Sequence, residues 1–199
     1  MDVEDKIKLF RHELGYIHDE KIRKFARWAV SVLPDYFFTT SASSTGKYHP
    51  KYATGDGGLV RHTKAAVRTA ITLLNLDMFS RVYTGIQRDI IITALILHDG
   101  VKKGVPEEKY TKHDHPLLVG EYLEGAFEAL TPEDVAVMTT VSVRAQVYRL
   151  IQSHMGQWNT NAKSNEVLPK PKTPAEKFVH MCDYIASRKL YEVNFEAQV

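Results

Sequence analysis

Apolar and polar positions repeat with helical spacing along almost the whole chain, and no pair of segments shows the alternation expected of strands. The pattern predicts an all-α fold, a bundle of helices. The most apolar segment, residues 90–97, closes on the polar pair His98-Asp99. The predicted helices cover residues 3–15, 19–33, 58–77, 87–99, 117–130 and 131–154, the last of these either continuous or with one break, and a final helix begins after Thr173.

Particular residues mark the ends of several of these helices. The second helix is expected to end at Leu33, because the residue before a proline disfavours helical geometry. Thr131, followed by a proline and two acidic residues, is typical of a helix start, since the threonine can cap the helix and the acidic side chains face its positive end. Thr173 with Glu176 forms a capping-box pattern, which predicts the start of the last helix.

The longest segment without helical spacing, residues 39–58, is rich in Ser, Thr and Gly and too long for a passive connection. One interpretation is a disordered excursion. We favour a substrate-facing loop, because its cationic and aromatic side chains have the chemistry to bind phosphates and to stack on bases. These side chains are Lys47, Tyr48, His49, Lys51 and Tyr52.

Composition limits the number of domains and the kinds of partner. A chain of 199 residues with 44% hydrophobic content can bury one sizeable core. We therefore expect a single domain over residues 1–199, with the N-terminal helices and the substrate-facing loop in 1–56 and the core in 57–192. The net charge of +2 is compatible with an anionic substrate and far below that of a dedicated nucleic-acid binder.

Cysteine content and hydropathy bear on the compartment. Cys182 is the single cysteine, which excludes an internal disulfide and a cysteine-rich zinc site and fits a reducing compartment. The acidic N-terminal residues have no apolar stretch after them, so no secretory signal is expected. The longest apolar run, about eight residues, is too short to span a bilayer. We expect a cytoplasmic protein without membrane contact, and nothing in the sequence indicates a stable protein partner.

The pair His98-Asp99 is the strongest chemical signal in the chain. Two desolvated polar groups at the end of an apolar segment need partners, and a metal ion is the most economical one. Taken singly, a histidine on a helix face is more often packed or solvated than a metal ligand. Together with the pair, further residues make an ordered set that favours a metal site. The further residues are His62, His115, His154 and Asp183.

Helical spacing places two members of this set toward the core. The apolar positions around His154 and Asp183 recur three, four and seven residues away, so both side chains are expected on core-facing sides of their helices. An unpaired core aspartate costs several kcal/mol. The alternative to a metal is a buried ion pair of Asp183 with Arg188 or Lys189, which a separation of five or six residues on a helix disfavours.

This residue set suits phosphate-ester chemistry. Two ions about 3.5–4 Å apart lower the pKa of a bridging water and neutralise charge on the phosphoryl group, and a bridging carboxylate holds them together. Asp99 is the candidate for that carboxylate. Imidazole ligands favour Mn, Fe, Co, Ni or Zn, so we expect two divalent transition-metal ions. Arg61, Lys102 and Arg188 flank the ligands and could donate to phosphate oxygens.

At these residues the chain resembles the HD-domain superfamily of metal-dependent phosphohydrolases, over about residues 57–192. The superfamily motif matches His62, His98-Asp99 and Asp183, and the further histidines of its dinuclear branch match His115 and His154. The same ligand order occurs in small stand-alone diadenosine tetraphosphate hydrolases. Two elements resemble the HD half of bacterial 3′–5′ exoribonucleases, namely Gly57-Gly58-Leu59-Val60-Arg61-His62 and Ser153-His154-Met155-Gly156.

The resemblance implies an HD-domain helical bundle with a dinuclear centre. It implies one ion held by His62, His98, Asp99 and Asp183, and a second held by Asp99, His115 and His154. The chain departs from the family pattern at two places. Gly100-Val101 reverses the usual order before Lys102, which affects where that lysine points, and Met155 stands where many relatives have a second histidine.

Three functions follow as hypotheses, in order of preference. The first is an enzyme that hydrolyses a phosphoester or phosphoanhydride of a small nucleotide or short oligonucleotide through a metal-bridging hydroxide, with Asp99 and Lys102 as catalytic residues. The second is a 3′–5′ exonuclease on single-stranded RNA or DNA that uses the aromatic residues of the loop as stacking platforms. The third is a non-catalytic metal-binding regulator. His113 is expected outside the site, and His180 is expected to be structural.

Overall fold

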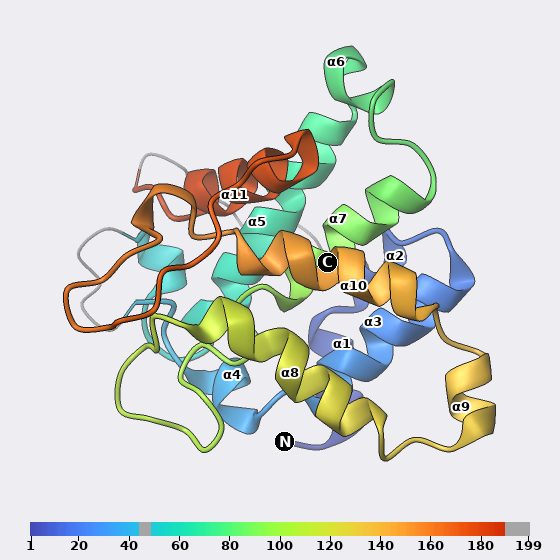
Figure 1. The fold of residues 1–199 in the computed structure, drawn as a ribbon, viewed down its shortest axis with the longest axis horizontal. Coiled ribbons are helices and arrows are strands. Elements are labelled where there is room, and N and C mark those ends of the chain that lie inside the picture. The colour runs from blue at the N-terminus through green and yellow to red at the C-terminus, as the bar shows by residue number, and fades with distance from the viewer. Residues whose placement is uncertain (44–48, 190–199) are drawn as a thin grey trace.

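The computed structural model describes residues 1–43 and 49–189, and within these residues the regular structure is entirely helical (Figure 1). The prediction of an all-α fold is confirmed. The α-helices are α1 (Val3–Leu9), α2 (Arg11–Gly15), α3 (Glu20–Val32), α4 (Asp35–Thr39), α5 (Gly58–Leu74), α6 (Asp77–Ser80), α7 (Ile86–Leu97), α8 (His115–Phe127), α9 (Pro132–Ala136), α10 (Val141–Gln152) and α11 (Pro174–Ala186), with short 3-10 helices η1 (Lys51–Ala53) and η2 (Gly156–Trp158).

Helix α7 lies at the centre of the bundle. Its residues from Asp89 to Leu97 are all buried, and a helix that is apolar on every side is stable only when other elements surround it. Helices α3, α5, α10 and α11 pack against it, and α10 crosses in front of it in Figure 1. The most apolar segment of the sequence is therefore the central helix of the bundle, and it ends at His98-Asp99.

The N-terminal helices are joined to this centre by a buried carboxylate. Asp89, in the first turn of α7, accepts hydrogen bonds from the backbone amides of His18 and Asp19, at 3.1 and 2.7 Å. The side chain of Asp19 in turn caps α3 by accepting from the amide of Ile22. The buried apolar side chains form one cluster that runs from Ile7 to Ala186, so residues from both 1–56 and 57–192 contribute to it.

Several helix boundaries differ from the sequence prediction. The segment 3–15 is two helices, interrupted at Phe10, whose ring is fully buried against Phe37. A proline does end α3, but α4 begins directly after Pro34 and was not predicted, because a proline that stops one helix is also well suited to precede the next. Helix α8 begins at His115 rather than at residue 117, since Pro116 is accommodated in the first turn.

The segment 131–154, predicted as a helix that is either continuous or broken once, is broken once. Helix α9 ends at Ala136, and α10 starts after Thr140, whose side chain accepts a hydrogen bond from the amide of Val143. A further short helix, α6, occupies part of the connection before α7. Thr173 and Glu176 form the predicted capping box at the start of α11.

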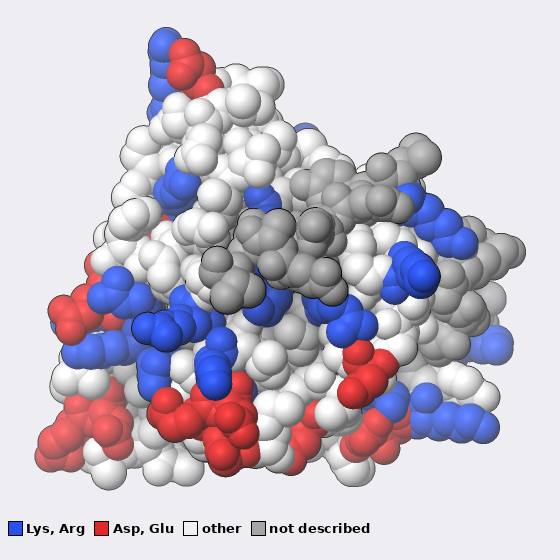
Figure 2. Space-filling view, turned by 180° about the vertical axis from the view of Figure 1, so that it is seen from behind, with Lys and Arg blue, Asp and Glu red and all other residues white. Residues whose placement is uncertain are grey.

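Charge is distributed over the visible surface in patches. On the face shown in Figure 2, Lys and Arg form several separate clusters across the middle, and Asp and Glu lie mostly along the lower part. No helix among residues 1–43 and 49–189 has both the length and the apolar character needed to cross a membrane.

Candidate metal centre

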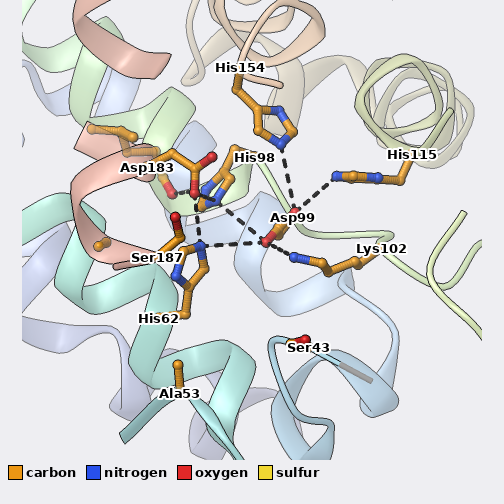
Figure 3. Close-up of polar contacts among 12 residues, drawn as sticks. Ser43, Ala53, His62, His98, Asp99, Lys102, His115, His154, Asp183 and Ser187 are labelled. Atoms are coloured by element: carbon orange, nitrogen blue, oxygen red, sulfur yellow. Dashed lines mark hydrogen bonds and ion pairs between the residues drawn. The ribbon is translucent and has the colours of Figure 1, made fainter. Parts of the chain in front are cut away.

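The six predicted metal ligands come together from five parts of the chain (Figure 3). Each lies at or near an end of a helix, or on the inner side of one. His62 is on α5, His98 and Asp99 follow α7, His115 is the first residue of α8, His154 follows α10, and Asp183 is on α11. All are at most 1% exposed except Asp183, whose side chain is 17% exposed.

Asp99 occupies the middle of this set, and its two oxygens face different histidines. Its Oδ1 atom lies 2.9 Å from Nε2 of His115 and 3.8 Å from Nε2 of His154. Its Oδ2 atom lies 3.5 Å from Nε2 of His98 and 3.7 Å from Nε2 of His62. The carboxylate is therefore placed between two pairs of imidazoles.

Asp183 adds a second carboxylate on one side of the set. Its Oδ1 atom lies 2.9 Å from Nε2 of His62 and 3.5 Å from Nε2 of His98. Ligand atoms of two triplets lie within 4.8 Å of one another, close enough to bind a common metal ion. The triplets are His62, His98 and Asp183, and His98, Asp99 and His154.

Three of the histidines are held by the same local contact. In each, Nδ1 lies 2.7 or 2.8 Å from the backbone carbonyl three residues earlier, and because a carbonyl only accepts, Nδ1 donates the hydrogen. In the neutral ring the Nε2 atom is then bare and points toward the carboxylates, as in metal-binding histidines. The pairs are His98 with Leu95, His115 with Lys112, and His154 with Ile151.

Several of these atoms are buried without a hydrogen-bond partner among the described residues. They are Nε2 of His98, together with Nε2 of His115 and Oδ1 of Asp99, which lie 2.9 Å apart without the geometry of a hydrogen bond. Bare imidazole lone pairs beside carboxylate oxygens repel one another unless a cation lies between them. Unsatisfied buried groups are costly, so the donor set fits a metal ion, which would accept electron pairs from both kinds of ligand.

The charges in the centre shift the pKa values of its members. Burial raises the pKa of Asp99, but Lys102, His98 and His115 outweigh burial and hold that pKa well below its usual range. Burial likewise raises the pKa of Asp183, and His62 and His98 outweigh it. Both carboxylates are therefore ionised at neutral pH and available as ligands.

The histidines respond to these charges in opposite ways. Burial lowers the pKa of His98, but Asp99 and Asp183 outweigh burial and raise it. Burial, reinforced by His98, lowers the pKa of His154 to about 3. His154 is therefore neutral near pH 7. The carboxylates beside His98 favour a positive charge at its Nε2 atom, which either a proton or a bound metal ion would supply.

Lys102 points into the centre. Its Nζ atom lies 2.6 Å from Oδ2 of Asp99, so the reversed order Gly100-Val101 has not turned the lysine away. The order has a steric reason: a Cβ on Gly100 would lie 2.8 Å from Cδ2 of Leu33 and 3.0 Å from the carbonyl oxygen of Leu97. The glycine thus permits α7 and the end of α3 to approach closely.

The centre opens into a cavity of about 650 Å³. Five of the six candidate ligands line it, and His98, which is fully buried, does not. The other lining residues are Ala42, Ser43, His49, Lys102, Thr111, Met155, Trp158, Tyr184, Ser187 and Arg188. A smaller cavity of about 270 Å³ shares Lys102 and Thr111 with it and adds Lys103 and Lys109. The ligand set is therefore accessible to a small molecule, and two cationic side chains, Lys102 and Arg188, line the same cavity.

Of the predicted substrate-binding residues, some line the cavity and others do not. Arg188 lines the cavity. Arg61 does not line it, and its guanidinium donates to the backbone carbonyls of Tyr52 and Thr54, which favours a role in holding the loop over the predicted contact with substrate. Lys51 is exposed on η1 and also does not line the cavity.

The other loop residues predicted to contact substrate are Lys47, Tyr48, His49 and Tyr52. Lys47 and Tyr48 lie outside the described residues. The hydroxyl of Tyr52 donates to the carbonyl of Ala186 at 2.8 Å, so this tyrosine connects the loop to the end of α11. His49 lines the cavity with its ring 5.4 Å from that of His62, and burial lowers its pKa to about 3.

Two further histidines, His113 and His180, do not line the cavity. The Nε2 atom of His113 lies 3.3 Å from the carbonyl of Asn159, away from the ligands. The Nδ1 atom of His180 lies 2.7 Å from the carbonyl of His154. His180 therefore holds the backbone of a candidate ligand without lining the cavity.

Sequence reasoning missed Trp158 and Tyr184, which line the cavity. Their signal was their position next to candidate ligands: Trp158 follows His154 by four residues and Tyr184 follows Asp183 directly. The described residues thus form a buried set of imidazoles and carboxylates that can hold metal ions beside an open cavity. Comparisons with protein-family models, with curated proteins and with solved structures found no match for this chain.

Proposed function

We propose that the protein is a metal-dependent phosphohydrolase that cleaves a phosphoester or phosphoanhydride of a nucleotide-type substrate. The observation that supports this most is the position of Asp99, whose two oxygens face separate pairs of buried imidazoles. The ordered resemblance to HD-domain phosphohydrolases supports the same reaction class.

Two divalent transition-metal ions fit the donor set. His62, His98 and Asp183, with Oδ2 of Asp99, would hold one ion, and His115 and His154, with Oδ1 of Asp99, would hold the other. Ions bound there would supply Lewis-acid chemistry, because such ions lower the pKa of water and neutralise phosphoryl charge. Imidazole donors favour Mn, Fe, Co, Ni or Zn over magnesium.

Protein side chains supply the remaining requirements. Lys102 keeps an ammonium group beside Asp99, where it can donate to a phosphoryl oxygen and stabilise negative charge that develops there. Lys109 also lines the adjoining cavity, whereas the ammonium of Lys103 is paired with Glu107. The carbonyl contacts of His98, His115 and His154 fix the rings so that their Nε2 atoms stay directed at the centre.

Two alternatives stay open as hypotheses and are separated by substrate. A 3′–5′ exonuclease needs a track that contacts several nucleotides, and its affinity for RNA falls steeply with salt. Of the loop aromatics proposed for that track, Tyr52 already has its hydroxyl bonded to the backbone of Ala186. A non-catalytic regulator binds metal but hydrolyses none of the compounds below.

The proposal is tested by a hydrolysis screen with Mn, Fe, Co, Ni and Zn added in turn. The compounds are nucleoside mono- and diphosphates, dinucleotides, dinucleoside polyphosphates and a ten-nucleotide RNA. Asp99→Asn is expected to abolish turnover. Asp114→Asn is the matched control, because Asp114 precedes His115 but does not line the cavity.

Phosphate release from a small nucleotide that depends on metal and on Asp99 supports the proposal. Activity confined to the RNA would favour the exonuclease hypothesis instead. If no compound is hydrolysed with any of the metals, the hydrolytic role is contradicted and the hypothesis of a metal-binding regulator is favoured.

A further inference from the structure

One wall of the cavity is formed by two aromatic rings and an arginine. Trp158 ends η2, Tyr184 is on α11, and Arg188 lies just beyond the end of that helix. All three line the cavity that Asp99 also lines. A compact ligand with a phosphate near Asp99 can therefore place another part of itself against this wall.

The three side chains are stacked on one another. The rings of Trp158 and Tyr184 have centroids 5.5 Å apart and planes inclined by 15°. The guanidinium of Arg188 lies 4.3 Å from the Tyr184 centroid and 5.4 Å from that of Trp158. It also donates to Oγ of Ser187, and no carboxylate among residues 1–43 and 49–189 pairs with it.

The wall brings two aromatic rings and a guanidinium to the cavity. Trp158 is 41% exposed although its ring is stacked on Tyr184. Aromatic rings and guanidinium planes are the groups on which nucleobases stack, and each such contact strengthens binding about five- to hundred-fold. A cavity of about 650 Å³ lies within the range of small-molecule sites.

We infer that Trp158, Tyr184 and Arg188 form a base-binding subsite, and that the substrate is a nucleoside phosphate rather than a phosphorylated sugar or a simple phosphoester. This inference rests on the proposed function, because it places the phosphate beside Asp99. It moves base recognition from the 39–58 loop, where the sequence suggested it, to the segments that follow His154 and Asp183.

The chain provides its own reporter for this subsite. It contains two tryptophans, and Trp28 packs in the core against Phe25 and Phe127. In the full-length Trp28→Phe variant, fluorescence comes from Trp158 alone. Rapid mixing of the metal-loaded protein with adenosine 5′-monophosphate gives the signal before turnover. Ribose 5-phosphate is then titrated alone and as a competitor.

We expect adenosine 5′-monophosphate to quench Trp158 with saturation and ribose 5-phosphate to leave the fluorescence unchanged. In the same background, Tyr184→Leu should weaken binding of the nucleotide about ten-fold and leave the competition constant of ribose 5-phosphate unchanged. Tyr184→Phe, which keeps the ring, should bind the nucleotide as the parent does.

Nucleotide that binds without quenching overturns the subsite, as does an equal loss of affinity for both compounds in Tyr184→Leu. Absence of nucleotide binding overturns it as well. These results are separable from the hydrolysis screen. Metal-dependent hydrolysis without quenching of Trp158 supports the proposed reaction and contradicts the base-binding subsite. Quenching of Trp158 without hydrolysis of any compound supports the subsite and contradicts the proposed reaction.

Discussion

Gly156 connects the fold to a candidate ligand, and its replacement by alanine has a cost that can be worked from the structure. Its φ angle is +59°, and a Cβ at this position would lie 2.1–2.4 Å from three atoms of the His180 ring. That ring lies 2.7 Å, at Nδ1, from the carbonyl of His154. Gly156→Ala therefore strains the backbone and also displaces the side chain that holds the His154 backbone.

The two costs are separable. A left-handed φ costs alanine about 1 kcal/mol net of the entropy that glycine loses on folding. Displacement of the ring forfeits a hydrogen bond of about 1 kcal/mol and aromatic contacts with Trp158 and Tyr184 worth about 1 kcal/mol more. The expected loss in the free energy of unfolding is about 3 kcal/mol in total.

Urea unfolding of a double-mutant cycle measures these parts. In a His180→Ala background the ring is absent, so Gly156→Ala should cost only about 1 kcal/mol, a coupling of about 2 kcal/mol. Gly55→Ala is the control for backbone strain alone, because Gly55 has a φ of +71° and no atom lies within 4 Å of its Cβ position. Equal costs of Gly156→Ala in the two backgrounds would refute the steric argument.

Three further predictions concern the centre and the loop held by Arg61. Lys102→Ala should keep the metal content but lower turnover ten- to thousand-fold, about the effect of removing one charge-stabilising donor, and unchanged kcat contradicts this. Chelation should lower the free energy of unfolding by about 5 kcal/mol, which is about 2.7 kcal/mol for each of two ions present at a hundredfold its Kd, and an unchanged Tm contradicts this. Arg61→Ala should lower the free energy of unfolding by about 1–3 kcal/mol, because two loop carbonyls lose their donor. The inhibition constant of phosphate should stay unchanged in this variant.

The helical pattern could be predicted because burial imposes it on the sequence. Residues 90–97 are apolar on every side, and α7 is surrounded on every side. The breaks were harder to predict. The interruption at Phe10 depends on its packing with Phe37, a contact across 27 positions that local periodicity does not contain.

That the candidate ligands lie close together could also be predicted, since few residue types bind metal and these stand in a recognisable order, whereas their binding of metal stays a prediction. Their surroundings could not be predicted. Arg61 was expected to contact substrate because it adjoins His62, but its partners are carbonyls on an irregular loop. Trp158 follows a turn at Gly156, and only the folded chain shows that it stacks on Tyr184 of another helix.

The central claim is that Asp99 joins two metal ions. Elemental analysis after anaerobic loading and removal of free metal tests it most directly, on the wild type and on Asp99→Asn, with Asp114→Asn as control. We expect about two transition-metal ions per chain in the wild type and in the control, and loss of most of both in Asp99→Asn. Retention of a single ion that is unaffected by His115→Ala and His154→Ala, or an equal metal content in Asp99→Asn, would contradict it.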